Sequence, residues 1–259
     1  MSVLLQLDKT TIRFGGLTAV ANLDLQIGPN ELVGLIGPNG AGKTTVFNLI
    51  TGVYPPTGGG IFFDGQSIAG KKPHQITARG IARTFQNIRL FSSLTVFDNV
   101  RAAFHLRLRG DVRHALWRGK NFFAEENEIA AKVLELLEIF SLGKFQNVRA
   151  KNLSYGDQHR LEIVRALATQ PKLLLLDEPA AGMNPQEKTE LTRLIQFIKD
   201  EFQIAILLVE HDMQVVMGIC KKIAVLDYGV KIAEGAPAEI RANKKVIEAY
   251  LGEELKIQN

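Results

Sequence analysis

Short runs of uninterrupted apolar residues are the feature that most constrains how this chain can fold. Leu173–Leu176 and Ile204–Val209 are apolar at every position. Segments with helical spacing of their apolar residues lie between such runs. A strand that is apolar on both faces must be covered on both sides, as in a parallel sheet with helices packed above and below it. The chain is therefore predicted to be an α/β protein with a largely parallel sheet.

Turn signals and periodicity assign the remaining segments. Extended structure is expected at four further places: residues 3–27 as a β-hairpin or meander, 31–36, 61–66 as a strand and then a turn, and 223–226 paired with 230–233. Helices are expected at residues 44–52, 158–170, 185–200 and 237–252. Residues 55–60, which read PPTGGG, are predicted to form a loop.

Residues 101–150 differ in composition from the rest of the chain. They are rich in Ala, Leu, Glu and Arg, and predict a helical subdomain whose middle, about 110–124, loops out. The expected organisation is one domain over residues 1–259. Its predicted parts are an antiparallel β subdomain at about 1–30 and 60–70, a helical subdomain at about 95–160, and a C-terminal helical tail at about 237–259.

Charge and composition narrow the class of partner. The 259 residues are 46% hydrophobic, which suits a globular protein with a core, and the formal net charge of +4 does not argue for nucleic acid. Cys220 is the sole cysteine, so no disulfide can form within the chain, and we expect it to be a small buried apolar residue. We expect no signal peptide. No apolar run approaches the roughly 20 residues of a membrane span, so contact with a membrane is expected through a partner or the surface.

A glycine-rich loop follows the predicted strand 31–36. Residues 37–44, GPNGAGKT, match the pattern G-x-x-x-x-G-K-[ST] and precede a predicted helix. In such a loop, successive backbone N–H groups and the helix N-terminus converge on phosphate oxygens. Lys43 is then expected to neutralise the β- and γ-phosphates, and the Thr44 hydroxyl to ligate Mg²⁺. The alternative, an ordinary turn before a helix, does not explain the strand–loop–helix context.

Two carboxylates end the apolar strand at 173–176. Ligands of open α/β sheets bind at the carboxyl ends of the strands, where Asp177 and Glu178 are expected to lie. Asp177 is predicted to hold Mg²⁺, and Glu178 to orient or deprotonate the attacking water. A solvated acidic turn is the alternative, which the upstream phosphate loop disfavours.

A third motif completes a resemblance to a known family. Residues 153–158, LSYGDQ, are similar to the signature LSGGQ of the nucleotide-binding subunits of ABC transporters. Ser154, Gly156 and Gln158 match the signature, whereas Tyr155 and Asp157 depart from its commonest letters. The resemblance covers nearly the whole chain and implies a P-loop NTPase fold with ABC architecture: a mixed sheet core, an antiparallel β subdomain and a helical subdomain.

The resemblance implies further site residues. Gln86 matches the glutamine that senses Mg²⁺ and γ-phosphate, His211 the switch histidine, and Phe14 the aromatic that stacks on adenine, although Phe14 could instead be a core residue. Asn184 stands where the family often has Asp, so contacts across the dimer could differ there. The implied catalytic residues are Glu178, His211, Gln86 and Lys43. The implied Mg²⁺ ligands are Thr44, Gln86 and Asp177. The implied ATP contacts are Phe14, Gly37, Pro38, Asn39, Gly40, Ala41, Gly42, Lys43, Thr44, Thr45, Ser154, Gly156 and Gln158.

Several longer phrases resemble the branched-chain amino-acid importers within this family. They include RFGGLTAV, ARTFQNIRLFSSLTV, DEPAAGMNP and VEHDMQVVM, and the insertion near 105–130 resembles the longer of that branch's two ATPase subunits. The resemblance implies ATP hydrolysis at the cytoplasmic face of the membrane by a peripheral subunit. It implies a second ATPase subunit, identical or related, two transmembrane permease subunits and, indirectly, an external binding protein. No nucleic-acid partner is expected.

The sequence leaves open other functions and other roles for some of these residues. A related urea or amide importer shares many of these phrases. A non-transport ABC ATPase would show two cassettes, zinc-binding Cys pairs or coiled-coil arms, and a regulatory module would lack Glu178 or His211. Leu90 and Phe91 fit either a groove for a permease helix or a core. The basic run from Arg101 to Lys120 fits either a solvated helix face or contact with lipid or partner loops.

Overall fold

The computed structural model describes residues 2–104 and 120–257. The chain divides into two compact units: unit 1 comprises residues 1–86 and 172–259, and unit 2 comprises residues 87–171. Within the described residues, no helix combines the length and apolar character needed to span a bilayer.

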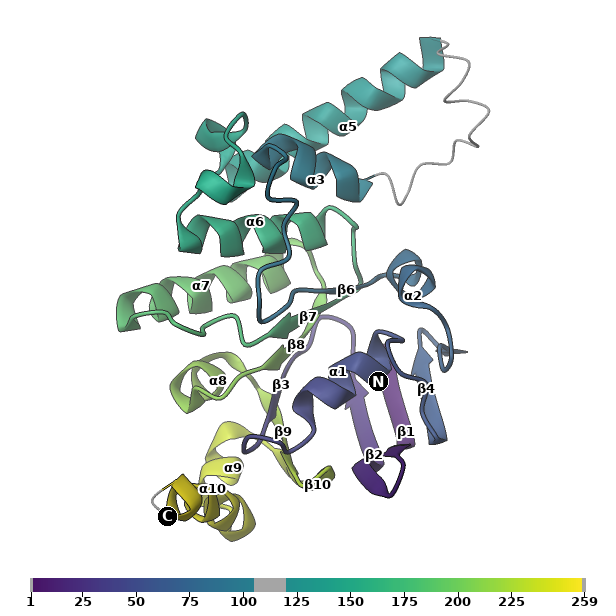
Figure 1. The fold of residues 1–259 in the computed structure, drawn as a ribbon, viewed down its shortest axis with the longest axis vertical. Helices are drawn as coiled ribbons and strands as arrows, with labels where there is room; N and C mark the ends of the chain where they lie inside the picture. The colour runs from purple at the N-terminus through teal and green to yellow at the C-terminus, as the bar shows by residue number, and fades with distance from the viewer. Residues whose placement is uncertain (1, 105–119, 258–259) are drawn as a thin grey trace. The chain divides into compact units, whose positions relative to one another are not determined.

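A six-stranded sheet forms the centre of unit 1, in the order β10-β9-β3-β8-β7-β6 (Figure 1). Its strands are β3 (Leu32–Ile36), β6 (Ile81–Arg83), β7 (Leu173–Asp177), β8 (Ala205–Val209), β9 (Lys222–Asp227) and β10 (Val230–Gly235). The pairings β9–β3, β3–β8, β8–β7 and β7–β6 are parallel, and β10 pairs antiparallel with β9. Strands β3, β7 and β8 are buried at every position. The predicted parallel sheet with fully apolar strands is therefore confirmed.

A second, antiparallel sheet belongs to the same unit. Its order is β2-β1-β4-β5, with strands β1 (Leu5–Phe14), β2 (Leu17–Ile27), β4 (Gly58–Phe63) and β5 (Gln66–Ser67). Helix α1 (Lys43–Ile50) contributes Phe47 and Ile50 to one apolar core shared with both sheets. This core fixes where α1 begins, and hence where the glycine-rich loop lies.

The remaining helices of unit 1 lie in the chain before β6, after β7, after β8 and after β10 (Figure 1). They are α2 (Pro73–Arg79), α7 (Pro185–Glu201), α8 (Met213–Ile219), α9 (Pro237–Ala242) and α10 (Lys244–Ile257). Helix α7 has a proline at its first position and a capping box between Asn184 and Glu187, which explains why it begins there.

Unit 2 is helical, with α3 (Val96–Phe104), α5 (Lys120–Ile139), α6 (Tyr155–Leu167) and two 3₁₀ turns, Gly143–Phe145 and Ala150–Asn152. Helix α3 contacts both α5 and α6. Fully buried apolar residues from these helices form its interior: Val100, Val133, Leu137 and Leu161.

Several predicted boundaries are wrong. Residues 58–60 belong to β4 instead of a loop, and a Cβ at Gly59 would lie 2.2 Å from the Lys9 carbonyl oxygen, so glycine there allows β1 to pair closely. Residues 120–124 are helical in α5, whereas 110–119 of the predicted loop lie outside the described residues. Helix α6 covers 155–167 where 158–170 was predicted, and the C-terminal helix is interrupted at Asn243. The short elements α2, β6 and α8 were not predicted.

Candidate functional site

The glycine-rich loop connects β3 to α1 with a backbone that other residues would disturb. Gly40 and Gly42 have φ angles of 76° and 102°, in the left-handed region. A Cβ at Gly42 would lie 2.8 Å from the carbonyl oxygen of Ala19, and one at Gly37 would lie 2.2 Å from that of Leu226. The loop therefore needs glycine at these positions both for its curvature and for its contact with neighbouring backbone.

The turn between β9 and β10 is hydrogen-bonded to this loop. The Gly229 amide donates to the Ala41 carbonyl at 2.9 Å, and the Ala21 amide donates to the Gly229 carbonyl at 2.8 Å. The loop is thus fixed to the two sheets of unit 1.

Lys43, the first residue of α1, turns back over the loop. Its Nζ donates to the carbonyl oxygens of Gly37 at 2.6 Å and Pro38 at 2.9 Å, and the residue is 6% exposed. Thr44 is exposed beside it, and no side chain caps the N-terminus of α1. A cation, a curled backbone and an uncapped helix N-terminus together suit an anionic ligand.

A buried ion pair ends strand β7. Asp177 Oδ2 accepts from Nη2 of Arg83 at 2.7 Å, and the two side chains are 6% and 8% exposed. Arg83 Nη1 also donates to Asn48 Oδ1 on α1 at 2.8 Å. Sequence reasoning predicted Asp177 but missed Arg83, since its only signal is a charged residue ending a short apolar segment before Gln86.

Glu178 lies among other predicted site residues. Its Oε2 accepts from Gln86 Nε2 at 2.9 Å and is 3.6 Å from Nδ1 of His211. Glu178 has a φ of 48°, and its amide donates to the Val209 carbonyl at 2.9 Å. Three residues that are far apart in the sequence therefore converge at the carboxyl ends of β6, β7 and β8.

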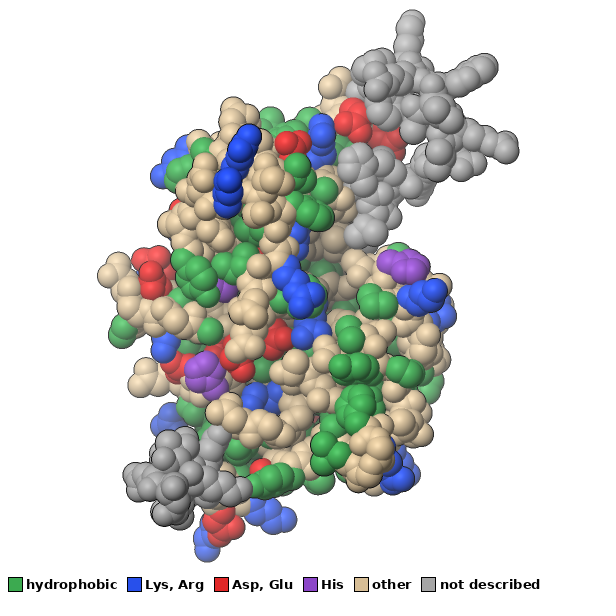
Figure 2. Space-filling view, viewed as in Figure 1, with side chains coloured by type: hydrophobic (Ala, Val, Ile, Leu, Met, Phe, Trp, Pro, Cys, Tyr) green, Lys and Arg blue, Asp and Glu red, His purple; other side chains and the backbone are tan. Residues whose placement is uncertain are grey.

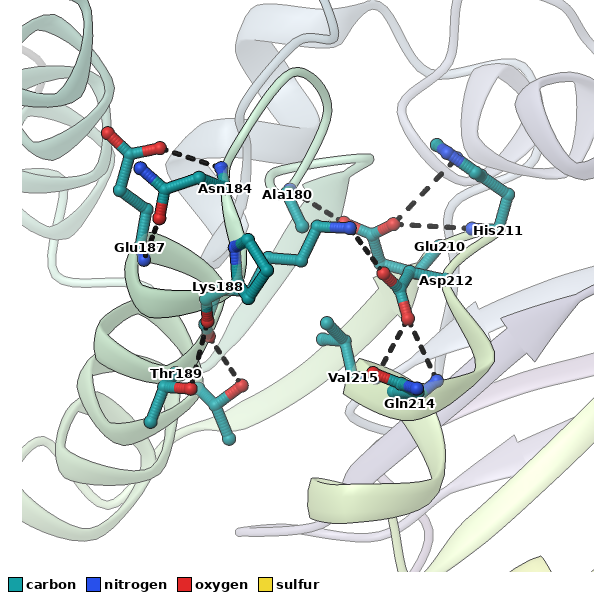
Figure 3. A network of polar contacts seen from close by, with 12 residues as sticks. Ala180, Asn184, Glu187, Lys188, Thr189, Glu210, His211, Asp212, Gln214 and Val215 are labelled. Atoms are coloured by element: carbon teal, nitrogen blue, oxygen red, sulfur yellow. Dashed lines mark hydrogen bonds and ion pairs between the residues drawn. The ribbon is translucent and has the colours of Figure 1, made fainter.

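A second carboxylate, Glu210, directly precedes His211 and contacts the backbone on both sides of the site (Figure 3). It is fully buried, and it accepts from the amides of Ala180 at 2.7 Å and His211 at 3.2 Å. Burial raises the pKa of Glu210, and the backbone donors and His211 offset part of that effect. Glu210 therefore links the segment after Glu178 to the loop between β8 and α8, which contains His211. The sequence analysis did not identify it, although it directly precedes His211.

The loop between β8 and α8 is held from its other side by α7. Asp212 caps α8 by accepting from the amides of Gln214 and Val215, and its second oxygen accepts from Lys188 Nζ at 2.6 Å (Figure 3). This Lys188 contact lowers the pKa of Asp212. The side chain of Asn184 likewise caps a helix, since it accepts from the first backbone amides of α7.

Phe14 lies at the end of β1 and is 44% exposed, so it is not a core residue. Its ring makes an edge contact with Tyr54, with centroids 5.1 Å apart. Leu17 and Val53 add to this exposed apolar surface, and Figure 2 shows apolar side chains gathered over this part of unit 1. On the same face, acidic and basic side chains are interspersed.

The signature residues belong to unit 2, at the start of α6. Ser154 caps this helix by accepting from the Asp157 amide, and its hydroxyl donates to Asp157 Oδ2 at 2.6 Å. Gln158 Nε2 donates to the Leu153 carbonyl, and a Cβ at Gly156 would meet nothing within 4 Å. The predicted helix cap at Ser154 is therefore present.

The segment that follows Gln86 is also part of unit 2. Of the two residues left open between a groove and a core, Phe91 is 52% exposed, whereas Leu90 is half-buried. The Arg89 amide donates to the buried carboxylate of Glu162, and Asn99 pairs with both backbone groups of Phe91. Of the basic run, Arg101 forms ion pairs with Asp98 and Glu126, and most of the remaining members lie outside the described residues.

Comparison with known proteins shows which family the chain belongs to. The ABC transporter family profile matches residues 20–181, and a branched-chain amino acid ATP-binding cassette transporter profile matches residues 230–256. The chain is 47% identical over 250 residues to the high-affinity branched-chain amino acid transport ATP-binding protein LivG of Escherichia coli, covering 96% of this chain and 98% of LivG. It is 45% identical over 250 residues, with the same coverage of each chain, to BraF of Pseudomonas aeruginosa, which has the same descriptive name.

A solved ATP-binding cassette of an ABC transporter, in its ADP conformation, has the same fold. It superposes with a TM-score of 0.84 at 29% identity, covering 98% of this chain and 100% of that chain. The fold and the phosphate loop thus define an ATP-binding cassette ATPase, and the chain belongs to the ABC transporter family. Within that family it is an ATP-binding subunit of the branched-chain amino acid importer type.

Proposed function

We propose that this chain binds ATP with Mg²⁺ and hydrolyses it to drive the import of branched-chain amino acids. One observation carries the hydrolytic part: the Glu178 carboxylate lies 2.9 Å from the Gln86 amide nitrogen and 3.6 Å from the His211 ring nitrogen. The cargo rests on the similarity to LivG and BraF, whose names state branched-chain amino acid transport.

The triphosphate would lie against the glycine-rich loop. Lys43 would leave the carbonyl oxygens of Gly37 and Pro38 and donate to phosphate oxygens instead, because those oxygens carry full negative charge. The amides of residues 39–45 and the N-terminus of α1 would add hydrogen bonds. The exposed ring of Phe14 offers a flat apolar face for the adenine.

The available donors fit Mg²⁺. Thr44 presents an exposed hydroxyl at the start of α1, and Asp177 presents a carboxylate at the end of β7. Mg²⁺ prefers oxygen ligands and usually keeps water and substrate phosphates, so it needs no cage of protein carboxylates. No such cage of three acidic, His or Cys residues occurs in the described part of the chain. Thr44, Asp177 and, through its amide oxygen, Gln86 would hold the ion, which supplies charge neutralisation of the phosphates.

Glu178 would orient the attacking water and accept its proton. The Gln86 amide fixes one carboxylate oxygen of Glu178, so the second oxygen can face the water. His211 would donate to the γ-phosphate, and Glu210 positions the His211 backbone for that contact. Lys43 would stabilise the charge that develops on the phosphate oxygens.

We further propose that a second ATPase subunit, identical or related, completes the site. Ser154, Gly156 and Gln158 would contact the ATP bound by the partner, because the N-terminus of a helix suits its γ-phosphate. ATP would then stabilise the closed dimer, and hydrolysis would release it. The dimer would bind two permease subunits at the cytoplasmic face of the membrane, supplied by an external binding protein.

The cargo can be tested in proteoliposomes that contain this chain, its companion ATPase, both permease subunits and the binding protein. We expect leucine, isoleucine and valine each to stimulate ATP hydrolysis and to accumulate inside, and urea to do neither. Stimulation by urea or a short amide alone would assign the chain to that importer instead.

A further inference from the structure

The buried side chain of Arg83 contacts the predicted metal ligand, Asp177. Arg83 ends β6, which pairs with β7, and its guanidinium reaches the carboxylate that ends β7. Its Nη1 donates to Asn48 on α1, and the guanidinium lies 5.4 Å from the ring centre of Phe47 and 5.0 Å from that of Phe85. Arg83 thus joins the strand before Gln86, the helix after the phosphate loop, and Asp177.

Burial makes this pairing energetically important. Asp177 and Arg83 are each less than a tenth exposed, and a buried carboxylate without a counter-ion is strongly disfavoured. In the absence of Mg²⁺, Arg83 supplies that charge. The hydrogen bond to Asn48 and the contacts with the two rings hold the guanidinium in place. Arg83 therefore does not need to move away when Mg²⁺ binds.

The carboxylate has two oxygens, and Arg83 contacts only one of them. Oδ2 accepts from Arg83 at 2.7 Å, which leaves Oδ1 for a metal ion or for a water bound to it. Two cations would then share one carboxylate. Because like charges repel across a partly buried site, the guanidinium must weaken the binding of the metal.

We infer that Arg83 is a positioning residue that serves as the resident counter-ion of Asp177 and limits how tightly Mg²⁺ is held with ATP. This inference rests on the proposed binding of ATP with Mg²⁺. A site with Arg83 keeps Asp177 paired before the nucleotide arrives, and it lets the metal leave again with ADP. Without Arg83, Mg²⁺ becomes the only partner of the carboxylate.

The test measures how strongly Mg²⁺ and ATP favour each other's binding. The ATP dissociation constant is determined by calorimetry in EDTA and again in Mg²⁺. The value in EDTA divided by the value in Mg²⁺ is the coupling ratio of the two ligands. Arg83→Met and Arg83→Gln remove the charge, whereas Arg83→Lys keeps it. We expect the coupling ratio to rise about tenfold in the first two variants and to stay within about twofold of the wild type in Arg83→Lys.

Lys222→Met is the control, since it removes a cation from another ion pair of unit 1, with Glu31. Its coupling ratio should equal that of the wild type. Thermal unfolding in EDTA gives a second readout: Arg83→Met should lower the melting temperature, and adding Asp177→Asn should recover at least half of that loss.

The outcomes separate the two proposals. A wild type whose ATP affinity does not depend on Mg²⁺ would contradict the proposed function. A wild type that depends on Mg²⁺, together with Arg83→Gln and Arg83→Met ratios that are unchanged or lower, would overturn the role of Arg83 alone. If Arg83→Met does not fold, Arg83→Gln against Arg83→Lys decides the same question.

Discussion

Replacing Glu210 with glutamine should change how the stability of this protein depends on pH. Glu210 is fully buried at the end of β8, and burial raises its pKa above the ordinary 4.5. Glutamine has nearly the same shape, and its amide oxygen can still accept from the Ala180 amide, 2.7 Å away in the wild type. The substitution therefore removes the charge and retains the strongest backbone contact.

The sign of the effect follows from the raised pKa. A carboxyl whose pKa is higher in the folded state than in the unfolded state stabilises the fold at low pH, and this contribution is lost as the pH rises through the folded-state pKa. Each unit by which the pKa is raised corresponds to about 1.4 kcal/mol. Near pH 4 the two proteins should agree within about 1 kcal/mol, the net value of one hydrogen bond. Toward pH 8 the wild type should lose stability relative to Glu210→Gln.

Urea unfolding of both proteins from pH 4 to pH 8 measures this difference. We expect the free energy of unfolding of Glu210→Gln, minus that of the wild type, to increase with pH over the window that starts near 4.5. A difference that stays constant, or that decreases with pH, would show that burial does not dominate the titration of Glu210.

Three further predictions concern other parts of the chain. Lys43→Ala should weaken ATP binding at least about 100-fold in calorimetry, because a buried charge-assisted contact with phosphate is lost; unchanged affinity would contradict the phosphate-loop assignment. Ser154→Ala should lower the free energy of unfolding by about 1 kcal/mol, and Ser154→Asn, which can still cap α6, should restore most of it. Burial raises the pKa of the Cys220 thiol to about 12, so it should resist a disulfide reagent at pH 8 until urea unfolds the protein; immediate modification of the folded protein would refute this.

The elements that could be predicted from the sequence are those with a strong local signal. The strands β7 and β8 are wholly apolar, and the glycine-rich loop has a defined pattern before a helix. By contrast, β6 has three residues and α8 has seven, too few for a period to emerge. The glycines of β4 signalled a loop, and only the pairing with β1 makes them a strand.

The site was predictable where a residue lies within a motif. Glu178 was predicted from its place at the end of an apolar strand, Gln86 and His211 were identified by resemblance, and the fold brings these three together. Arg83 and Glu210 act through residues on neighbouring strands, and no spacing along the chain reveals such contacts. Their roles emerge only once the order of the strands in the sheet is known.

Glu178, which accepts a hydrogen bond from Gln86 and lies 3.6 Å from His211, is proposed to activate water for ATP hydrolysis. Single-turnover hydrolysis of ATP in Mg²⁺ by the assembled transporter tests it directly, with Glu178→Gln compared with Glu190→Gln, which makes the same change at an exposed position of α7. We expect Glu178→Gln to bind ATP with near-normal affinity and to hydrolyse it about 100-fold more slowly or worse, while Glu190→Gln matches the wild type. Hydrolysis by Glu178→Gln at the wild-type rate would contradict the account.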